Sequence, residues 1–238
     1  MTVAASTGES ATMRFTVAAT GDTAARRPLP LVLSLHYSGP DTLPPYFGAS
    51  LLERVVLPAL APLGALFVAP DAPDRGWGSP RSERLVLALL DSLVVRYPVD
   101  ARRTLVTGYS LGGMGSWYLA SRHPDRFRAA IPMASFPVLV RDNRRDSLVA
   151  EVARFTSGPD TAWVAPLRRV PWFVLQSRAD ETMPFAPMLS FSERLKTLGV
   201  DVQLVALDSI THQQTVRFRE PLRGALPWIR KQWNQSRR

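Results

Sequence analysis

The sequence predicts an α/β fold of three layers, in which a mostly parallel sheet is covered by helices on both faces. Two observations support this. Apolar runs of strand length recur along the chain without polar interruption, which is typical of strands buried on both faces. These runs alternate with amphipathic helical patterns, and that alternation indicates parallel strands joined by crossover helices. A chain of 238 residues can form one core, so a single domain over residues 1–238 is expected.

Each predicted element follows from the period of its apolar residues. The expected strands, in chain order, are 13–19, 30–36, 65–70, 102–108, 128–134, 170–177 and 200–207. The expected helices are 50–60, 81–96, 112–122, 190–198 and 220–233. Pro98 ends the second of these helices, because a proline cannot continue the hydrogen-bond ladder.

One segment, residues 136–168, is far longer than the few residues that usually connect two elements. Asp146 or Ser147 can cap a short helix within it. The apolar positions that would share one face of this helix are Leu148, Val149, Val152 and Phe155. We expect a small cap-like insertion that lies over the substrate pocket and selects the substrate.

The composition narrows the functional classes. The net charge is +9, but the arginines are scattered and no basic stretch interleaves with aromatic residues, so nucleic-acid binding is disfavoured. A basic surface can still attract anionic substrates. Cysteine is absent, which excludes disulfides and a thiol nucleophile. Neither a secretory signal nor a membrane-spanning stretch is recognisable, so a cytoplasmic protein without membrane contact is expected.

The most informative motif is Gly108-Tyr109-Ser110-Leu111-Gly112, which fits G-x-S-x-G between a predicted strand and a predicted helix. Such a turn exposes a nucleophilic serine, and small residues on either side let the strand and helix approach closely. The alternatives are a structural serine in a glycine-rich turn or a phosphate-binding loop. No P-loop lysine follows, and Ser116 on the ensuing helix is suited to packing. Ser110 is therefore the candidate nucleophile.

A serine nucleophile needs a base and a third group that orients the base. His123 lies at a helix end and His36 ends an early strand, so His212, in the loop after the last predicted strand, is the candidate base. For the orienting acid we prefer Asp180, in the loop after a buried strand. Glu181 is adjacent to it, and Asp208 is the main rival because it is closer to His212 in sequence.

The early segment "LHYSG" ends a buried strand at the same predicted edge of the sheet. The backbone N–H of Ser38 is expected to form an oxyanion hole together with that of Leu111.

These motifs resemble the α/β-hydrolase superfamily. The resemblance is closest to bacterial esterases of the dienelactone-hydrolase, phospholipase/carboxylesterase and prolyl-oligopeptidase-like group. It is carried by "YPVDARRTLVTGYSLGGMGSWYLASRHPDRFRAAIPMAS", by "SRADETMPF" and by "TH", and the order Ser110, Asp180, His212 is that of these enzymes. The resemblance implies a serine carboxylic-ester hydrolase that acts on small to medium esters without a metal or organic cofactor.

This sequence departs from the group where Tyr37 follows His36, because relatives usually have glycine there. Tyr37 and Tyr109 are candidate pocket residues, and Trp77 and Trp163 could form further pocket walls or simply pack in the core. Two other functions stay open: a peptidase or amidase of the prolyl-oligopeptidase-like type, and a non-catalytic binding protein. No partner other than a small-molecule ester is indicated, and the oligomeric state is undetermined.

Overall fold

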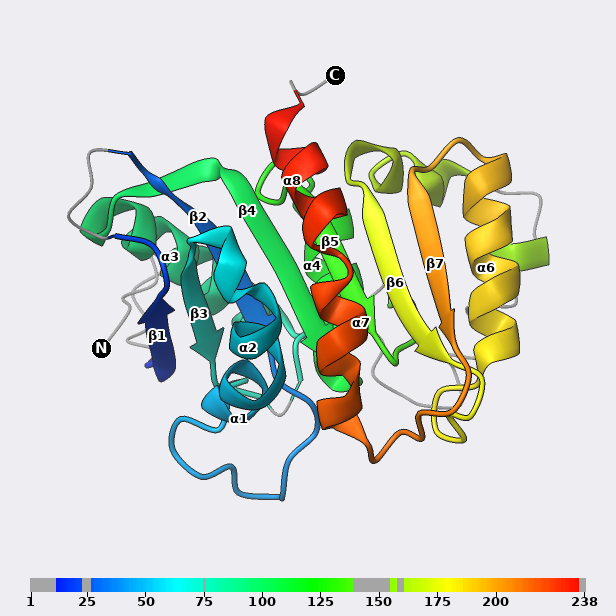
Figure 1. The fold of residues 1–238 in the computed structure, drawn as a ribbon, viewed down its shortest axis with the longest axis horizontal. Coiled ribbons are helices and arrows are strands. Elements are labelled where there is room, and N and C mark those ends of the chain that lie inside the picture. The colour runs from blue at the N-terminus through cyan, green and yellow to red at the C-terminus, as the bar shows by residue number, and fades with distance from the viewer. Residues whose placement is uncertain (1–11, 23–26, 75, 139–154, 158–160, 236–238) are drawn as a thin grey trace.

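The computed structural model describes residues 12–22, 27–74, 76–138, 155–157 and 161–235. They contain a seven-stranded sheet in the order β1-β3-β2-β4-β5-β6-β7, drawn in Figure 1. The strands are β1 (Phe15–Ala19), β2 (Leu29–Leu35), β3 (Leu66–Pro70), β4 (Val99–Tyr109), β5 (Ala129–Met133), β6 (Trp172–Ser177) and β7 (Val202–Leu207). Only the edge strand β1 is antiparallel to its neighbour. The predicted α/β class and mostly parallel sheet are therefore confirmed.

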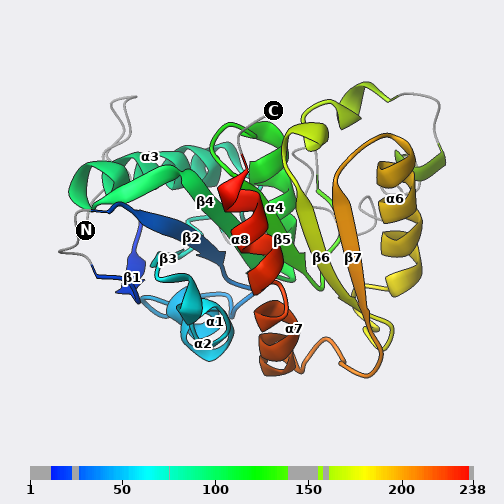
Figure 2. The same cartoon turned by 45° about the horizontal axis from the view of Figure 1, so that its top comes forward.

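Helices cover both faces of the sheet, as Figures 1 and 2 show. One face is covered by α3 (Pro80–Arg96), α4 (Leu111–Arg122) and α6 (Phe185–Thr197). The other is covered by α1 (Ala49–Leu51), the π-helical turn η1 (Leu52–Val56), α2 (Leu57–Leu60), α7 (Arg219–Arg223) and α8 (Leu226–Asn234). The described residues also include four short 3₁₀ turns: η2 (Ala61–Leu63), η3 (Ala162–Val164), η4 (Leu167–Arg169) and η5 (Thr215–Phe218).

The apolar strands contribute side chains to two hydrophobic cores, one on each face of the sheet. Along β2, Leu31 and Leu33 enter the core beneath α3 and α4, while Val32 between them enters the core beneath α1 and α2. Successive side chains of a strand point to opposite faces, so a strand between two helical layers must be apolar throughout. No helix within the described ranges combines the length and the apolar content needed to cross a membrane.

Prolines account for most of the differences between the predicted and observed helices. The predicted helix 220–233 is split into α7 and α8, and Pro227 stands in the first turn of α8, where its missing N–H costs nothing. Helix α6 begins at Phe185, before the predicted 190, because Pro187 is likewise tolerated in a first turn. The predicted helix 50–60 contains the π-helical turn η1.

The cap-like insertion is described only in part. Most of its predicted helix, including Asp146 and Ser147, lies outside the described residues. Phe155 is buried with its ring 4.7 Å from that of Trp163, and Trp163 stacks on Phe191 of α6 at 5.8 Å. These described parts pack against the outer helix α6.

A buried carboxylate joins two helices on one face of the sheet. Glu83 of α3 accepts hydrogen bonds from the hydroxyl of Tyr118 at 2.7 Å and from the side chain of Arg122 at 3.0 Å. It also contacts Nε2 of His123 at 2.6 Å. Burial raises the pKa of Glu83, but these hydrogen bonds and the charge of Arg122 outweigh burial and lower that pKa to about 2.

We predict that Glu83→Gln lowers the free energy of unfolding by about 2 kcal/mol at pH 7. The carboxylate contributes its full stabilisation above the unfolded-state pKa of about 4.3, and loses it as the pH falls toward about 2. The difference between the two proteins in urea denaturation should therefore shrink from pH 6 to pH 3. Asp91→Asn, which removes an exposed partner of Arg126, is the matched control and should cost less than about 0.5 kcal/mol. Equal losses in the two variants would contradict the role of Glu83.

Candidate active site

Ser110 occupies a sharp turn between β4 and α4. Its φ of 53° and ψ of −114° place it in a region that residues other than glycine rarely adopt. The turn brings neighbouring backbones into close contact. A Cβ at Gly112 would lie 1.8 Å from the carbonyl oxygen of Leu35, and one at Gly108 would lie 2.3 Å from the carbonyl oxygen of Gly112. Any larger residue at either glycine would push β2, β4 and α4 apart.

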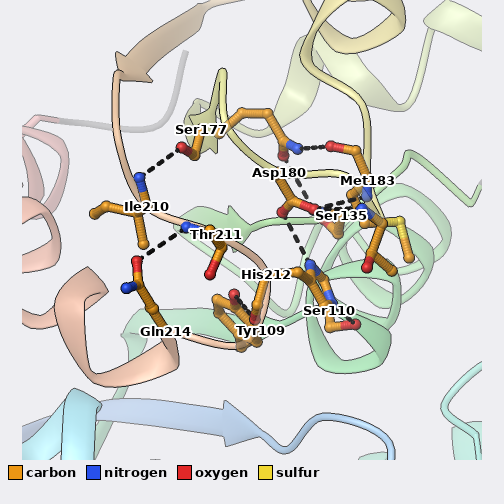
Figure 3. Close-up of polar contacts among 12 residues, drawn as sticks. Tyr109, Ser110, Ser135, Ser177, Asp180, Met183, Ile210, Thr211, His212 and Gln214 are labelled. Atoms are coloured by element: carbon orange, nitrogen blue, oxygen red, sulfur yellow. Dashed lines mark hydrogen bonds and ion pairs between the residues drawn. The ribbon is translucent and has the colours of Figure 1, made fainter.

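Three side chains from distant loops meet at this turn, as Figure 3 shows. His212 Nε2 lies 2.9 Å from Ser110 Oγ, and His212 Nδ1 lies 2.9 Å from Asp180 Oδ2. A carboxylate only accepts hydrogen bonds, so the proton of a neutral His212 ring resides on Nδ1. Nε2 is thereby left to accept the hydroxyl proton of Ser110. All three residues are buried, with 4–9% of their surface exposed.

The loop that carries Asp180 fixes its carboxylate. Oδ1 accepts the backbone N–H groups of Thr182 at 3.0 Å and Met183 at 2.7 Å, while Oδ2 faces His212. Its sequence rivals lie elsewhere. The side chain of Asp208 is 88% exposed and pairs with Arg178, and Glu181 is exposed. Asp180 is the acid that the structure brings to His212.

The other two histidines have structural partners. His123 is bonded to Glu83 at the end of α4. His36 is buried; its Nε2 accepts the N–H of Ala72 at 3.0 Å and its Nδ1 donates to the carbonyl of Tyr37 at 2.6 Å. Burial lowers the pKa of His36 below its ordinary value, which favours this neutral form. His36 thus fixes the loop that leads to Ser38.

A cavity of about 750 Å³ opens beside Ser110 and His212. Ser38 and Leu111, the expected oxyanion-hole residues, both line it. Leu111 is the first residue of α4, where a backbone N–H has no intrahelical acceptor and the positive end of the helix dipole lies. The free N–H and the helix dipole would both stabilise a negative charge that develops at this position.

Of the four predicted pocket residues, Tyr37 and Tyr109 line this cavity, whereas the two tryptophans do not. Trp77 is 1% exposed and its indole N–H donates to the carbonyl of His36 at 3.1 Å. It packs against Gly115 of α4 and therefore belongs to the core. Trp163, in η3, stacks on Phe191 of α6. The described residues of the 136–168 insertion are likewise absent from the cavity lining, and most of the insertion lies outside the described residues, so its position over the pocket stays a prediction.

Two polar residues at the end of β6, which the sequence analysis did not select, brace the site. Ser177 Oγ accepts the N–H of Ile210 at 3.1 Å and so joins the acid loop to the His212 loop. Gln176 accepts the N–H of Ser135 at 3.1 Å and donates to the carbonyl of Met183. A Gln-Ser pair that ends an otherwise apolar strand is the sequence signal that could have identified them.

Tyr109 also has a second contact with the site. Its hydroxyl donates to the backbone carbonyl of His212 at 2.7 Å, and its ring lies 5.4 Å from the imidazole. Burial, followed by the charge of Asp180, raises the pKa of Tyr109, so this hydroxyl stays protonated and remains a donor. Tyr109 therefore holds the backbone of His212 next to Ser110.

We predict that Tyr109→Phe lowers kcat about tenfold on any substrate of this site, since a buried carbonyl loses its donor and His212 loses its alignment. The change should appear mainly in kcat rather than in KM, because the ring that lines the cavity is retained. Steady-state kinetics, with circular dichroism to confirm folding, measures this. A rise in KM at constant kcat would instead assign Tyr109 to substrate binding.

The fold and this arrangement define an α/β hydrolase, and comparison with solved structures agrees. A thermostable esterase superposes with a TM-score of 0.69 at 18% identity, over 94% of this chain and 60% of the other. Est1E from Butyrivibrio proteoclasticus superposes with a TM-score of 0.68 at 15% identity, over 99% of each chain. Likeness at this level of identity shows the common fold.

A sequence profile of the prolyl oligopeptidase family matches residues 84–235, and the chain belongs to this family. Among curated proteins, feruloyl esterase C of Emericella nidulans is 30% identical over 105 residues, which is 43% of this chain and 39% of that protein. The feruloyl esterases that match are each covered over less than half of their own length.

Proposed function

We propose that this protein is a serine carboxylesterase that hydrolyses small to medium carboxylic esters through an acyl-enzyme on Ser110. The observation that carries the proposal is the pair of 2.9 Å contacts that link Ser110, His212 and Asp180 at the wall of a cavity. Nucleophile, base and orienting acid are in reach of one another, which is the geometry of acyl transfer. The feruloyl esterases and esterases that resemble the chain support the same chemistry.

The proposed reaction follows from the positions of the protons. His212 removes the hydroxyl proton of Ser110 as its Oγ attacks the ester carbonyl, and the N–H groups of Ser38 and Leu111 stabilise the oxyanion. His212 then gives this proton to the leaving alcohol. Water, activated by the same imidazole, hydrolyses the acyl-enzyme. His212 can act as this base only in its neutral form.

Three further proposals concern the chain as a whole. We propose that residues 1–238 form one domain, with 136–168 as a cap-like insertion. Hydrolysis without a metal or organic cofactor is proposed because the described side chains of the site supply the nucleophile, the base and the acid. A cytoplasmic location stays a prediction that rests on the cysteine-free composition.

A peptidase or amidase is the second candidate, and the match to the prolyl oligopeptidase family favours it. The same three residues would cleave an amide if the leaving amine were protonated by His212. Ester and anilide substrates that share one acyl group distinguish the two candidates.

We predict that the purified protein hydrolyses p-nitrophenyl esters of increasing acyl length and methyl ferulate, with lower activity on the matched p-nitroanilides. Ser110→Ala should lower kcat/KM by at least about a thousandfold, because the nucleophile is lost. Ser116→Ala is the matched control, since Ser116 Oγ donates only to the carbonyl of Gly112 in α4. It should retain activity within about threefold.

Two results would contradict the esterase proposal. Faster turnover of the anilides than of the esters would favour the peptidase candidate. Equal inactivity of the wild type and Ser110→Ala on every substrate would favour a non-catalytic binding protein.

A further inference from the structure

The cavity beside Ser110 is positively charged on one side. Two arginines, Arg54 of η1 and Arg217 of η5, are among its lining residues. Among the described residues that line it there is no aspartate or glutamate. The described lining therefore contains two arginines and no residue with a carboxylate to neutralise them.

The bonding of these arginines leaves their charges available. Arg217 Nη1 donates to the carbonyl of Ser209 at 3.0 Å and to the side-chain oxygen of Gln214 at 3.1 Å, which are both uncharged. These bonds leave further donors on the guanidinium. Arg54 makes no ion pair within the described ranges. An anion that enters the cavity would thus meet unneutralised charges.

The two arginines are also held on the same side of the cavity. Arg219 donates to the backbone carbonyl of Arg54 from Nε at 3.2 Å and from Nη2 at 2.7 Å. These two hydrogen bonds join the segment that carries Arg54 to the segment that carries Arg217. Figures 1 and 2 show the corresponding segments, around α1, α2 and α7, side by side on the same face of the sheet.

A third residue of the lining is an additional candidate donor. Ser50 Oγ is buried and has no hydrogen-bond partner among the described residues. A buried hydroxyl without a partner is unfavourable, and a rotation about its χ1 angle would offer its proton to a group in the cavity. Ser50 and Arg54 lie one helical turn apart, so they belong to the same wall.

We propose that this wall selects ester substrates that carry a second, negatively charged group, which Arg54 and Arg217 bind while Ser110 attacks the ester. This inference rests on the proposed esterase function and names the substrate class of that site. Guanidinium groups bind carboxylates and phosphates through charge-assisted hydrogen bonds. The test uses carboxylates, in which the charge can be removed by methylation without altering the ester that is cleaved.

The experiment compares kcat/KM within two pairs of ester substrates, each consisting of a carboxylate and its methyl ester. Mono-p-nitrophenyl adipate and its methyl ester place the second group on the acyl side, and 3-(4-acetoxyphenyl)propanoate and its methyl ester place it on the alcohol side. Spontaneous hydrolysis is subtracted from each rate. We expect the anionic member of at least one pair to be preferred by about fivefold or more. The preference should decrease as the ionic strength is raised from about 0.02 M to about 0.5 M.

Variants distinguish an effect of the cavity wall formed by Ser50, Arg54 and Arg217 from an effect of the protein's net positive charge. Arg54→Gln and Arg217→Gln, singly and together, should abolish the preference while the methyl esters are still hydrolysed. Arg217→Lys should keep part of the preference because it keeps the charge. Arg96→Gln, which removes an exposed charge at the end of α3, is the matched control and should leave the preference unchanged.

The outcomes are distinct. Hydrolysis of all four esters without a preference in either pair would overturn this inference and leave the esterase proposal intact. A preference that Arg96→Gln lowers as much as Arg54→Gln would also overturn it, by assigning the effect to net charge. Failure to hydrolyse any ester would overturn the proposed function itself.

Discussion

The close approach of three backbones around Ser110 is the constraint on which the rest of the site depends. The carbonyl of Leu35, the turn at Ser110 and the start of α4 meet so closely that a Cβ at Gly112 would lie 1.8 Å from that carbonyl oxygen. This contact stabilises the positive φ of Ser110, which otherwise costs about 1–3 kcal/mol. It also brings the end of β2, which leads to Ser38, against the start of α4. The candidate nucleophile and the strand that leads to a candidate oxyanion donor are thus positioned by one packing contact.

The bonds around the acid and the histidine complete the arrangement by holding loops rather than side chains alone. Ser177 joins the loop of Asp180 to the loop of His212, and Tyr109 reaches from the end of β4 to the carbonyl of His212. Each brace comes from the last residues of a buried strand. The rigid sheet therefore fixes the distances among three loops that are far apart in sequence, which is the preorganisation that acyl transfer requires.

The family and the fold indicate the kind of reaction, whereas the cavity lining bears on the choice of substrate. The prolyl oligopeptidase family and the α/β-hydrolase fold are compatible with cleavage of both esters and amides, since function depends on the site. The lining of the cavity bears on that choice more directly, because it includes Tyr37 and two arginines and, in the described part, no carboxylate. Substrate choice in this protein is therefore a question of cavity charge and shape.

The sequence by itself determined the strands, the class of the fold and the elbow at Ser110, because these depend on local patterns: apolar period, proline positions and the spacing of two glycines. It also selected His212 and Asp180, since each lies in a loop that follows a predicted strand. Only the tertiary structure decided that Asp208 faces solvent, that Trp77 is a core residue and that Arg54 and Arg217 share one wall. The physical reason is that side-chain burial and the meeting of distant loops depend on how helices pack across the sheet, which no local pattern records.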